Sequence, residues 1–505
     1  MTDEPQPLPA ARPRSLASQL FELTRHSAIY GIGGLISRFL SVLMLPLYTS
    51  YVSTGDYGRI ELLMAVMAVV VVVLRGGANF GFIRFYFLQK DPEYRRRLVR
   101  TVFWAQMTYS TAALVLCVLF ASQLAILLGV DVPTGSHLQG SGTSLVIATA
   151  VLLWANVNYL QMTNLFRVEQ RSLAFSIATL ANLVVTVVLT VIVVVVYHEG
   201  PLGIIVGNFS GTLVIYLILL AYRREQLGLQ FDRSLLRSLN RFGFPLMGAA
   251  LAMWVTNFGD RFMIRKLLHG SYALQQLGQY SIAYKVTSAM VLVFTAFQIA
   301  WPAFAYSIED DDEAKRAFSY VLTYLMFIAA WAAVGLSLFA PWIVHVVGRK
   351  PGYWPAATAV PALVYSSVFY AGFIVVTIAI GRTRQTQFNW IAAAAAAILN
   401  FGLNFWLIPA YGMLGAAYAT LAAYVLLMIV RTWNAQKLYP VSYQWRRVAI
   451  ILLGAGALTG TGEAFRHSLV LAFALTFAYP LLLAGLGFYL PAERKRLRRL
   501  LPAHN

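Results

Sequence analysis

The feature that most constrains this chain is a succession of apolar segments, each about 20 residues long or longer. A helix of about 20 apolar residues is long enough to cross the hydrocarbon core of a membrane. By that measure the sequence predicts about 14 transmembrane helices between residues 27 and 490. The composition agrees, because 59% of the 505 residues are hydrophobic and only 12% are charged. We therefore expect an all-α integral membrane protein.

The expected helices divide the chain into consecutive segments. Two groups of six helices are separated by a linker and followed by two further helices, with a short tail at each end. The ranges are 1–26 for a disordered cytoplasmic tail, 27–222 for helices 1 to 6, 223–241 for a cytoplasmic amphipathic linker along the membrane surface, 242–435 for helices 7 to 12, 436–490 for helices 13 and 14, and 491–505 for a basic cytoplasmic tail.

The positions of Lys and Arg residues predict the orientation, because cytoplasmic loops of membrane proteins are enriched in both. With a cytoplasmic N-terminus, most of the 39 basic residues fall in cytoplasmic loops and tails. The outer ones are Arg59, Arg265, Lys266, Arg349, Lys350 and Arg466. Both termini are therefore expected in the cytoplasm. The same loops account for the net charge of +19, so we expect no nucleic-acid partner.

The sequence lacks motifs for a disulfide, for metal or phosphate binding and for catalysis. The one cysteine, Cys117, excludes an internal disulfide. The seven histidines do not pair at the spacing of metal ligands, and there is no phosphate-binding Gly-Lys-Ser/Thr loop. No Ser, His and Asp residues can be grouped into a catalytic set. We therefore expect neither a metal nor a cofactor, and no enzyme activity.

Two pairs of stretches indicate an internal repeat. "VVYHEGPLGIIVGNFSGTLVIYL" and "LIPAYGMLGAAYATLAAYVLL" each end one apolar helix, turn through Gly-x-x-Gly and begin the next. The turn glycines are Gly200 and Gly203 in the first stretch and Gly412 and Gly415 in the second. "DYGRIELLMAVMAVVVVV" from residue 56 and "QYSIAYKVTSAMVLVF" from residue 279 form the other pair. Two six-helix halves in parallel orientation are typical of transporters with the substrate path between the halves.

Ionisable residues inside the expected spans are candidates for that path, because a charge in the membrane must face a protein interior or a wet cavity. The bases are Arg38, Arg75, Arg84, Arg261 and Lys285, and the one clear acid is Asp260. Glu61 lies at the outer rim of a span expected to begin at residue 60. This excess of bases predicts an anionic cargo, and phosphate or pyrophosphate is the natural match for arginine.

The individual roles differ. Arg38 lies in the middle of helix 1 with no acid in that helix, which favours contact with an anionic ligand. Arg75 stands beside two glycines at a possible helix break, and either a structural or a functional role suits it. Asp260 and Lys285 have similar depths and could meet. Asp260 and Arg261 fit a structural ion network as well as they fit a functional site.

Three passages resemble the polysaccharide flippases of the multidrug/oligosaccharidyl-lipid/polysaccharide exporter superfamily. They are "AIYGIGGLISRFLSVLMLPLYTSYVSTGDYGRIELL" from residue 28, "NFGDRFMIRKLLHGSYALQQLGQYSIAYKV" from residue 257 and "IPAYGMLGAAYATLAAY" from residue 408. The resemblance implies two V-shaped lobes that alternate between inward-open and outward-open states around a basic cavity. Helices 13 and 14 would be additional, as in the related lipid II flippases. Arg38, Arg84 and Lys285 occupy places comparable to the cavity bases of such proteins.

The function implied is transfer of a polyprenyl-pyrophosphate-linked oligosaccharide from the inner to the outer leaflet of a bacterial cytoplasmic (inner) membrane, for cell-surface or exopolysaccharide synthesis. Its partners would be the lipid-linked oligosaccharide, membrane lipids and other export proteins such as a polysaccharide polymerase. A multidrug or cation antiporter of the same fold requires deep acids, and only Asp260 fits. A membrane polymerase or ligase acting on lipid-linked sugars requires a long outer loop, and a structural scaffold remains a third alternative.

Overall fold

The computed structural model describes residues 40, 42–131, 141–382, 389–465, 468–491 and 493. Within these ranges every regular element is a helix, and nine of the helices are long and apolar enough to cross a membrane. The expectation of an all-α membrane protein is therefore confirmed for the described part of the chain. Arg38 lies outside the described residues.

The described parts of the first six expected spans form one group of helices, called the N-lobe here. Its elements are α2 (Leu45–Tyr51), α3 (Thr54–Leu88), α4 (Pro92–Leu119), α5 (Ala121–Leu128), α6 (Gly142–Val168), α7 (Ser172–Val191), η1 (Ile192–Val196) and α8 (Gly200–Tyr222). The short helix η2 (Arg224–Leu227) follows. Aromatic and aliphatic side chains of α3, α4, α6, α7 and α8 fill the core of this lobe.

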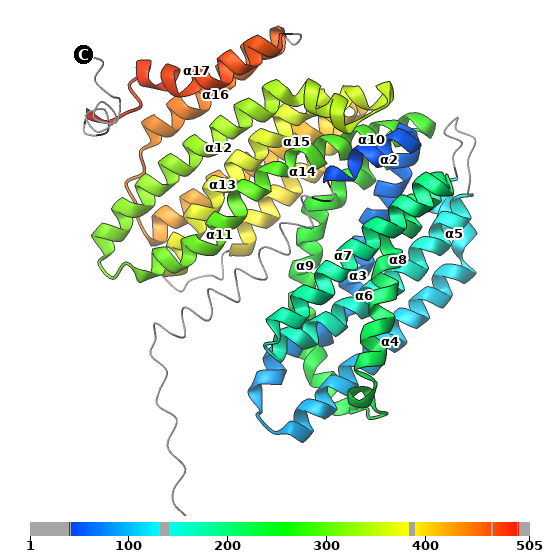
Figure 1. Ribbon diagram of the computed structural model, residues 1–505. Coiled ribbons are helices and arrows are strands. Elements are labelled where there is room, and N and C mark those ends of the chain that lie inside the picture. Colours follow the sequence, from blue (N-terminus) through cyan, green and yellow to red (C-terminus); the bar gives the residue numbers. More distant parts are fainter. Residues whose placement is uncertain are drawn as a thin grey trace, which may run out of the picture.

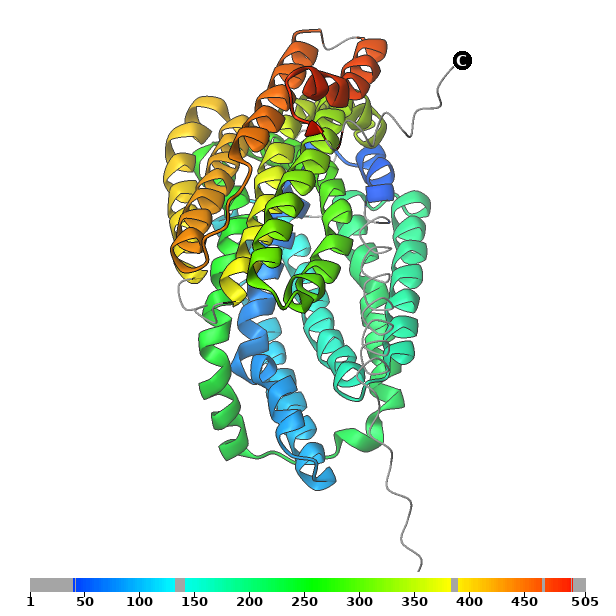
Figure 2. The ribbon, with the colours of Figure 1, turned by 90° about the vertical axis from the view of Figure 1, so that its left-hand side faces the viewer.

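The next spans form a second group, the C-lobe, followed by two further helices. The elements are α9 (Arg233–Leu267), α10 (Gly270–Thr287), α11 (Ala289–Ser307), α12 (Asp311–Val347), η3 (Pro351–Ala359), α13 (Val360–Arg382), α14 (Asn389–Tyr411), α15 (Met413–Leu438), α16 (Trp445–Ala464) and α17 (Leu469–Gly485). Both α16 and α17 contact α12 and lie on the side of the C-lobe that faces away from the N-lobe (Figures 1 and 2).

The two lobes meet at one end of the molecule and diverge from it, which gives the V shape of Figure 1. We call the meeting end the apex. It comprises α2, the first turns of α3, α10 and the segment 347–353 that leads into η3. The V-shaped arrangement implied by the resemblance is therefore present.

Helix α9 connects the lobes and differs from the expectation of a separate surface linker. It begins at Arg233, inside the range 223–241, and runs without interruption to Leu267. Leu235, Leu236 and Leu239 share one face of the helix and pack in the core of the N-lobe. The apolar face of the expected linker is thus covered by protein, because residues spaced by three and four positions lie on the same side of a helix.

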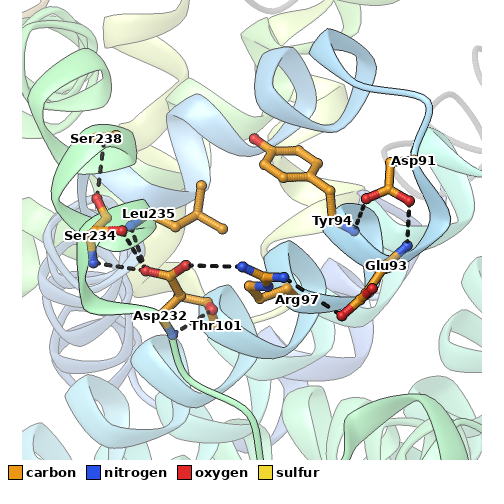
Figure 3. A network of polar contacts seen from close by, with 9 residues as sticks. All are labelled: Asp91, Glu93, Tyr94, Arg97, Thr101, Asp232, Ser234, Leu235 and Ser238. Carbon is orange, nitrogen blue, oxygen red and sulfur yellow. Dashed lines mark hydrogen bonds and ion pairs between the residues drawn. The ribbon is translucent and has the colours of Figure 1, made fainter.

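Asp232 fixes the start of α9 (Figure 3). Its carboxylate accepts hydrogen bonds from the backbone N–H groups of Ser234 and Leu235, and its own N–H donates to Thr101 of α4. Arg97 of α4 lies 3.9 Å from the same carboxylate. An acidic N-cap satisfies backbone donors that a helix leaves unpaired, so the first turn of α9 is tied to the N-lobe.

The repeated turns share a glycine with positive φ in both lobes. Gly200 begins α8 with φ +37° and Gly412 precedes α15 with φ +58°, a region of backbone conformation that favours glycine. Three residues later, a Cβ added at Gly203 would crowd Val193, and one added at Gly415 would overlap the carbonyl group of Leu407. The second glycine of each motif therefore lets the new helix pack closely against the preceding one.

Helix α3 is broken near its middle, as its two glycines suggested. Gly76 has φ +53° and ψ −176°, which is not helical. The carbonyl oxygen of Leu74 accepts a hydrogen bond from Gln106 of α4 at 3.1 Å, and Asn79 donates to the oxygen of the same Gln106 side chain. Neighbouring side chains often satisfy the backbone groups that a break in a transmembrane helix frees.

Candidate functional site

A cavity of about 270 Å³ lies at the apex, within the N-lobe and against Lys285 of the C-lobe. Residues of α2, α3, α7, α8 and α10 line it. Its polar lining residues are Tyr48, Tyr57, Glu61, Thr186, Thr190, Asn208 and Lys285. Lys285 is the basic residue among them and comes from the C-lobe, whereas the others come from the N-lobe.

Lys285 is held by two N-lobe side chains. Its Nζ lies 2.6 Å from Oε1 of Glu61 and donates a hydrogen bond to the hydroxyl of Tyr57. Glu61 is 6% exposed, and the Lys285 side chain is 28% exposed. This ion pair crosses the boundary between the lobes inside the cavity wall. Lys285 pairs with Glu61, and the expected meeting of Lys285 with Asp260 is not present.

Arg261 approaches the same carboxylate from the C-lobe. Its Nε lies 3.9 Å from Oε2 of Glu61, and one of its Nη atoms donates to the backbone oxygen of Asn257. The guanidinium group also lies over the ring of Tyr284, 4.7 Å from its centre. Arg261 is 3% exposed. Glu61 therefore stands between two cations of the C-lobe, which compensate its buried charge.

Asp260 points elsewhere, although it precedes Arg261 directly. Tyr280 donates to its carboxylate at 2.6 Å, and Thr420 and Asn404 each donate at 2.8 Å. These three neutral donors come from α10, α15 and α14, all in the C-lobe. Successive residues of a helix face about 100° apart, since one turn takes 3.6 residues. The predicted ion network thus separates into two sites with different partners.

Two further bases lie along α3, away from the apex. Arg75 is half-buried beside the break at Gly76, and its guanidinium lies 5.7 Å from the centre of the Phe80 ring. Arg167 of α6 lies close enough for its positive charge to act on Arg75. Arg84 is exposed and lies over the ring of Phe242, at 4.5 Å. The structure therefore spreads these bases along the N-lobe and does not gather them in the apex cavity.

Sequence reasoning missed Glu61 as a member of this site. The span was expected to begin at residue 60, whereas α3 begins at Thr54, which places Glu61 two turns inside the helix. The capping serine gave a signal: Ser53 accepts a hydrogen bond from the N–H of Asp56. A Ser followed three residues later by an acid is a common start of a helix.

The lobes are in backbone contact at the apex. A Cβ added at Gly58 of α3 would overlap the carbonyl oxygen of Leu274, and one added at Gly278 of α10 would overlap the carbonyl oxygen of Thr54. The two contacts are reciprocal, because each glycine meets the residue four positions before the other. Close approach of two helices through small residues is typical of membrane proteins.

Polar contacts surround this crossing. Thr49 of α2 donates to the carbonyl oxygen of Val347 at 2.6 Å, and Tyr353 donates to that of Ser53 at 2.9 Å. Gln279 donates to the carbonyl oxygen of Gly352 at 2.8 Å. Together with the glycine crossing, these contacts form what we call the apex seal. Two of these hydrogen bonds connect the N-lobe to the C-lobe, and the seal closes the space between the lobes at this end.

Comparison with known proteins agrees with this architecture. Residues 51–350 match the model of a family described as polysaccharide biosynthesis protein. The chain belongs to this family. The succinoglycan biosynthesis transport protein ExoT of Rhizobium meliloti is 22% identical over 325 residues, which are 63% of this chain and 61% of that protein. An uncharacterized membrane protein of Methanocaldococcus jannaschii is 25% identical over 240 residues, 45% of each chain. Each match spans less than two thirds of the relative's own length.

Solved structures share the fold at low sequence identity. The lipid II flippase MurJ in an inward closed conformation has a TM-score of 0.68 and 13% identity, with 91% of this chain and 99% of that chain covered. An inward-facing multidrug resistance MATE family transporter of the MOP superfamily has a TM-score of 0.60 and 14% identity, with 83% and 99% covered. The chain therefore has the fold of these two proteins, in addition to its membership of a family described as polysaccharide biosynthesis protein.

Proposed function

We propose that the protein is a flippase that moves a polyprenyl-pyrophosphate-linked oligosaccharide from the inner to the outer leaflet of a bacterial cytoplasmic membrane. The observation that carries the proposal is Lys285, a C-lobe base at the wall of a cavity otherwise lined by the N-lobe, with Arg261 near the same Glu61 carboxylate. Arg75 and Arg84 add positive charge along α3, toward the end at which the lobes diverge. Bases along one path favour a phosphorylated cargo.

In this proposal the apex faces the outer side and the diverging ends face the cytoplasm. The starts of α4 and α9, where the sequence is rich in arginine, lie at the diverging end (Figure 1), and cytoplasmic loops carry an excess of such residues. Arg97 of α4 lies there beside Asp232, which caps α9 (Figure 3). Both termini are then cytoplasmic. A periplasm-active reporter fused after Asn505 should be silent, and one inserted near Gly140 should be active; the opposite pattern would refute the orientation.

Purified protein in liposomes tests the activity itself. A fluorescent polyprenyl-pyrophosphate oligosaccharide placed in one leaflet should become accessible to a membrane-impermeant quencher on the other side. Arg38→Ala should abolish this transfer without lowering protein abundance, because Arg38 is assigned to the pyrophosphate. Arg38→Lys should keep part of the activity, since the charge remains but the paired N–H geometry of arginine is lost. Normal transfer by a stable Arg38→Ala protein would exclude that assignment.

A cation-coupled antiporter of the same fold is the second candidate, and Asp260 is the observation that favours it. A carboxylate that is 2% exposed and held by three neutral donors is suited to binding a coupling cation. The cavity argues against a cationic cargo, because Lys285 lines it and Glu61 is already paired. We therefore assign Asp260 to the coupling of flipping to an ion gradient.

A further inference from the structure

We propose that in the substrate-free protein the carboxylate of Glu61 occupies the site of the substrate's pyrophosphate. Binding of the substrate in the cavity then breaks the ion pair of Glu61 with Lys285, which connects the lobes. The inference rests on the proposed function, because it requires an anionic cargo. It assigns to Glu61 a positioning role that acts through Lys285 and Arg261.

The geometry around Glu61 is that of an anion bound by two cations. One carboxylate oxygen lies 2.6 Å from Nζ of Lys285, and the other lies 3.9 Å from Nε of Arg261. Nε of Arg261 is buried and makes no hydrogen bond in the described part of the chain. The two bases are thus spaced to share one anion, but the carboxylate of Glu61 satisfies only one of them fully. A phosphate group has more oxygens and more charge, and arginine binds it in a forked geometry.

Glu61 can be reached by a substrate because it lines the cavity together with Lys285 and Tyr57. The Lys285 side chain is 28% exposed, whereas Arg261 is 3% exposed. An anion entering the cavity therefore meets Lys285 first. Once Lys285 turns to the incoming phosphate, Glu61 loses its main partner. Its carboxylate is then free to accept hydrogen bonds from sugar hydroxyls or water.

The position of the pair connects this exchange to the apex seal. Glu61 lies one turn along α3 from Gly58, and Lys285 lies two turns along α10 from Gly278. The ion pair is therefore the first charged contact between the lobes beneath the glycine crossing. Its loss removes attraction between α3 and α10 next to the seal. The remaining contacts between the lobes, such as the hydrogen bonds from Thr49 to Val347 and from Lys350 to Val52, then hold the apex with less attraction.

This arrangement makes the opening of the apex depend on cargo. A neutral lipid carries no anionic group that competes with Glu61 for Lys285, so the ion pair between the lobes persists. A phosphorylated lipid replaces the carboxylate, and part of its binding free energy offsets the loss of the interlobe contact. A ligand shifts a conformational equilibrium only through such a difference between states. The empty protein would then cycle rarely, and the loaded protein often.

Binding of farnesyl pyrophosphate to the purified full-length chain in nanodiscs tests the exchange. Glu61→Gln should bind this probe about tenfold more tightly than the unmodified protein, because the competing carboxylate is gone. The double variant Glu61→Gln/Lys285→Gln should lose that gain. It should bind the probe more weakly than both the unmodified protein and Glu61→Gln. Glu61→Asp should resemble the unmodified protein. Glu93→Gln is the matched control, since Glu93 is an exposed carboxylate whose ion pair with Arg97 lies far from the cavity.

The state of the seal is a second readout, which a merely structural carboxylate would not move. Spin labels at Ser50→Cys on α2 and Tyr272→Cys on α10, both exposed and on opposite lobes, report the distance across the apex in a Cys117→Ala background. Farnesyl pyrophosphate should lengthen this distance in the unmodified protein. Glu61→Gln should show the longer distance without the probe, and farnesol, which lacks the phosphates, should leave every variant unchanged.

The outcomes separate the inference from the proposed function. If no variant binds farnesyl pyrophosphate, the pyrophosphate cargo is wrong and the role of Glu61 falls with it. If the unmodified protein and Glu61→Gln bind it equally well, the cargo stands but the competition is refuted. If Glu61→Gln binds more tightly but keeps the short distance, Glu61 does not tie the lobes, and the inference is overturned on that ground.

Discussion

Two buried carboxylates near the apex, Asp260 and Glu61, have opposite surroundings. Asp260 is held by neutral donors from α10, α14 and α15, which all belong to the C-lobe. Glu61 comes from the N-lobe and is held by cations of the C-lobe. The partners of Asp260 move together when the lobes move, whereas those of Glu61 separate from it. A change of charge at Asp260 therefore acts within one lobe, and a change at Glu61 acts between lobes.

The largest effect is expected from removing the cation that pairs with Glu61. Lys285→Gln should abolish flipping and destabilise the protein by about 3 kcal/mol, because Glu61 is left buried without its main cation. Adding Glu61→Gln should restore the stability but not the flipping, since the base that meets the cargo is still missing. Thermal unfolding and the liposome assay measure the two effects. If the double variant is less stable than Lys285→Gln, the pair is not an isolated unit.

A smaller effect is expected on the Asp260 side. Asp260→Asn should leave the fold intact, because the hydroxyls of Tyr280 and Thr420 can accept as well as donate. Flipping under an ion gradient should fall about tenfold, to the rate seen without a gradient, since couplings between sites are typically 5- to 150-fold. Transfer measured with and without an imposed proton or sodium gradient distinguishes the ions. An unchanged response to both gradients would remove Asp260 from coupling.

The apex seal should respond to size instead of charge. Gly278→Ala places a Cβ against the carbonyl oxygen of Thr54, and such overpacking typically costs about 1–3 kcal/mol. The state with the seal closed should lose population, so a thiol at Thr54→Cys, a position 7% exposed, should be labelled faster. Gly259→Ala is the control, because its Cβ would meet only Val255 at 3.7 Å. Equal labelling in the two variants would show that the crossing does not close the seal.

The smallest effect concerns a carboxylate outside the spans, Glu493. Burial raises its pKa, but hydrogen bonds from Tyr324 and the N–H of Leu490, together with the charge of Arg447, hold the pKa below its usual value. Its contribution to stability, about 1 kcal/mol or less, is present above the unfolded pKa of about 4.3. It is lost as the pH falls through the folded value.

Thermal unfolding of detergent-solubilised protein between pH 6 and pH 3, on the order of the range over which carboxylates titrate, measures that loss. The unmodified protein should lose more stability on acidification than Glu493→Gln does. Parallel curves for the two proteins would mean that this carboxylate does not anchor the chain after α17 to α12 and α16.

The sequence predicted what depends on local pattern. Apolar length gave the helices, and the two Gly-x-x-Gly turns gave a repeat whose glycines at 200 and 412 both have positive φ. The glycines after Arg75 indicated the break in α3. Partners could not be predicted in this way, because Tyr280, Asn404 and Thr420 reach Asp260 from three helices that are distant in the chain. Glu61 was misplaced because the start of α3 lies six residues before the expected span.

The reciprocal contact of Gly58 and Gly278 has the geometry of an isologous interface. In a twofold dimer, residue i of one copy touches residue j of the other, and j touches i. Here both copies of the patch lie in a single polypeptide, and each glycine meets the carbonyl group four residues before its counterpart. A Cβ at Gly58 and one at Gly278 would each come within 2.0 Å of a carbonyl oxygen of the other lobe. A side chain at either position therefore obstructs the closed seal to the same extent.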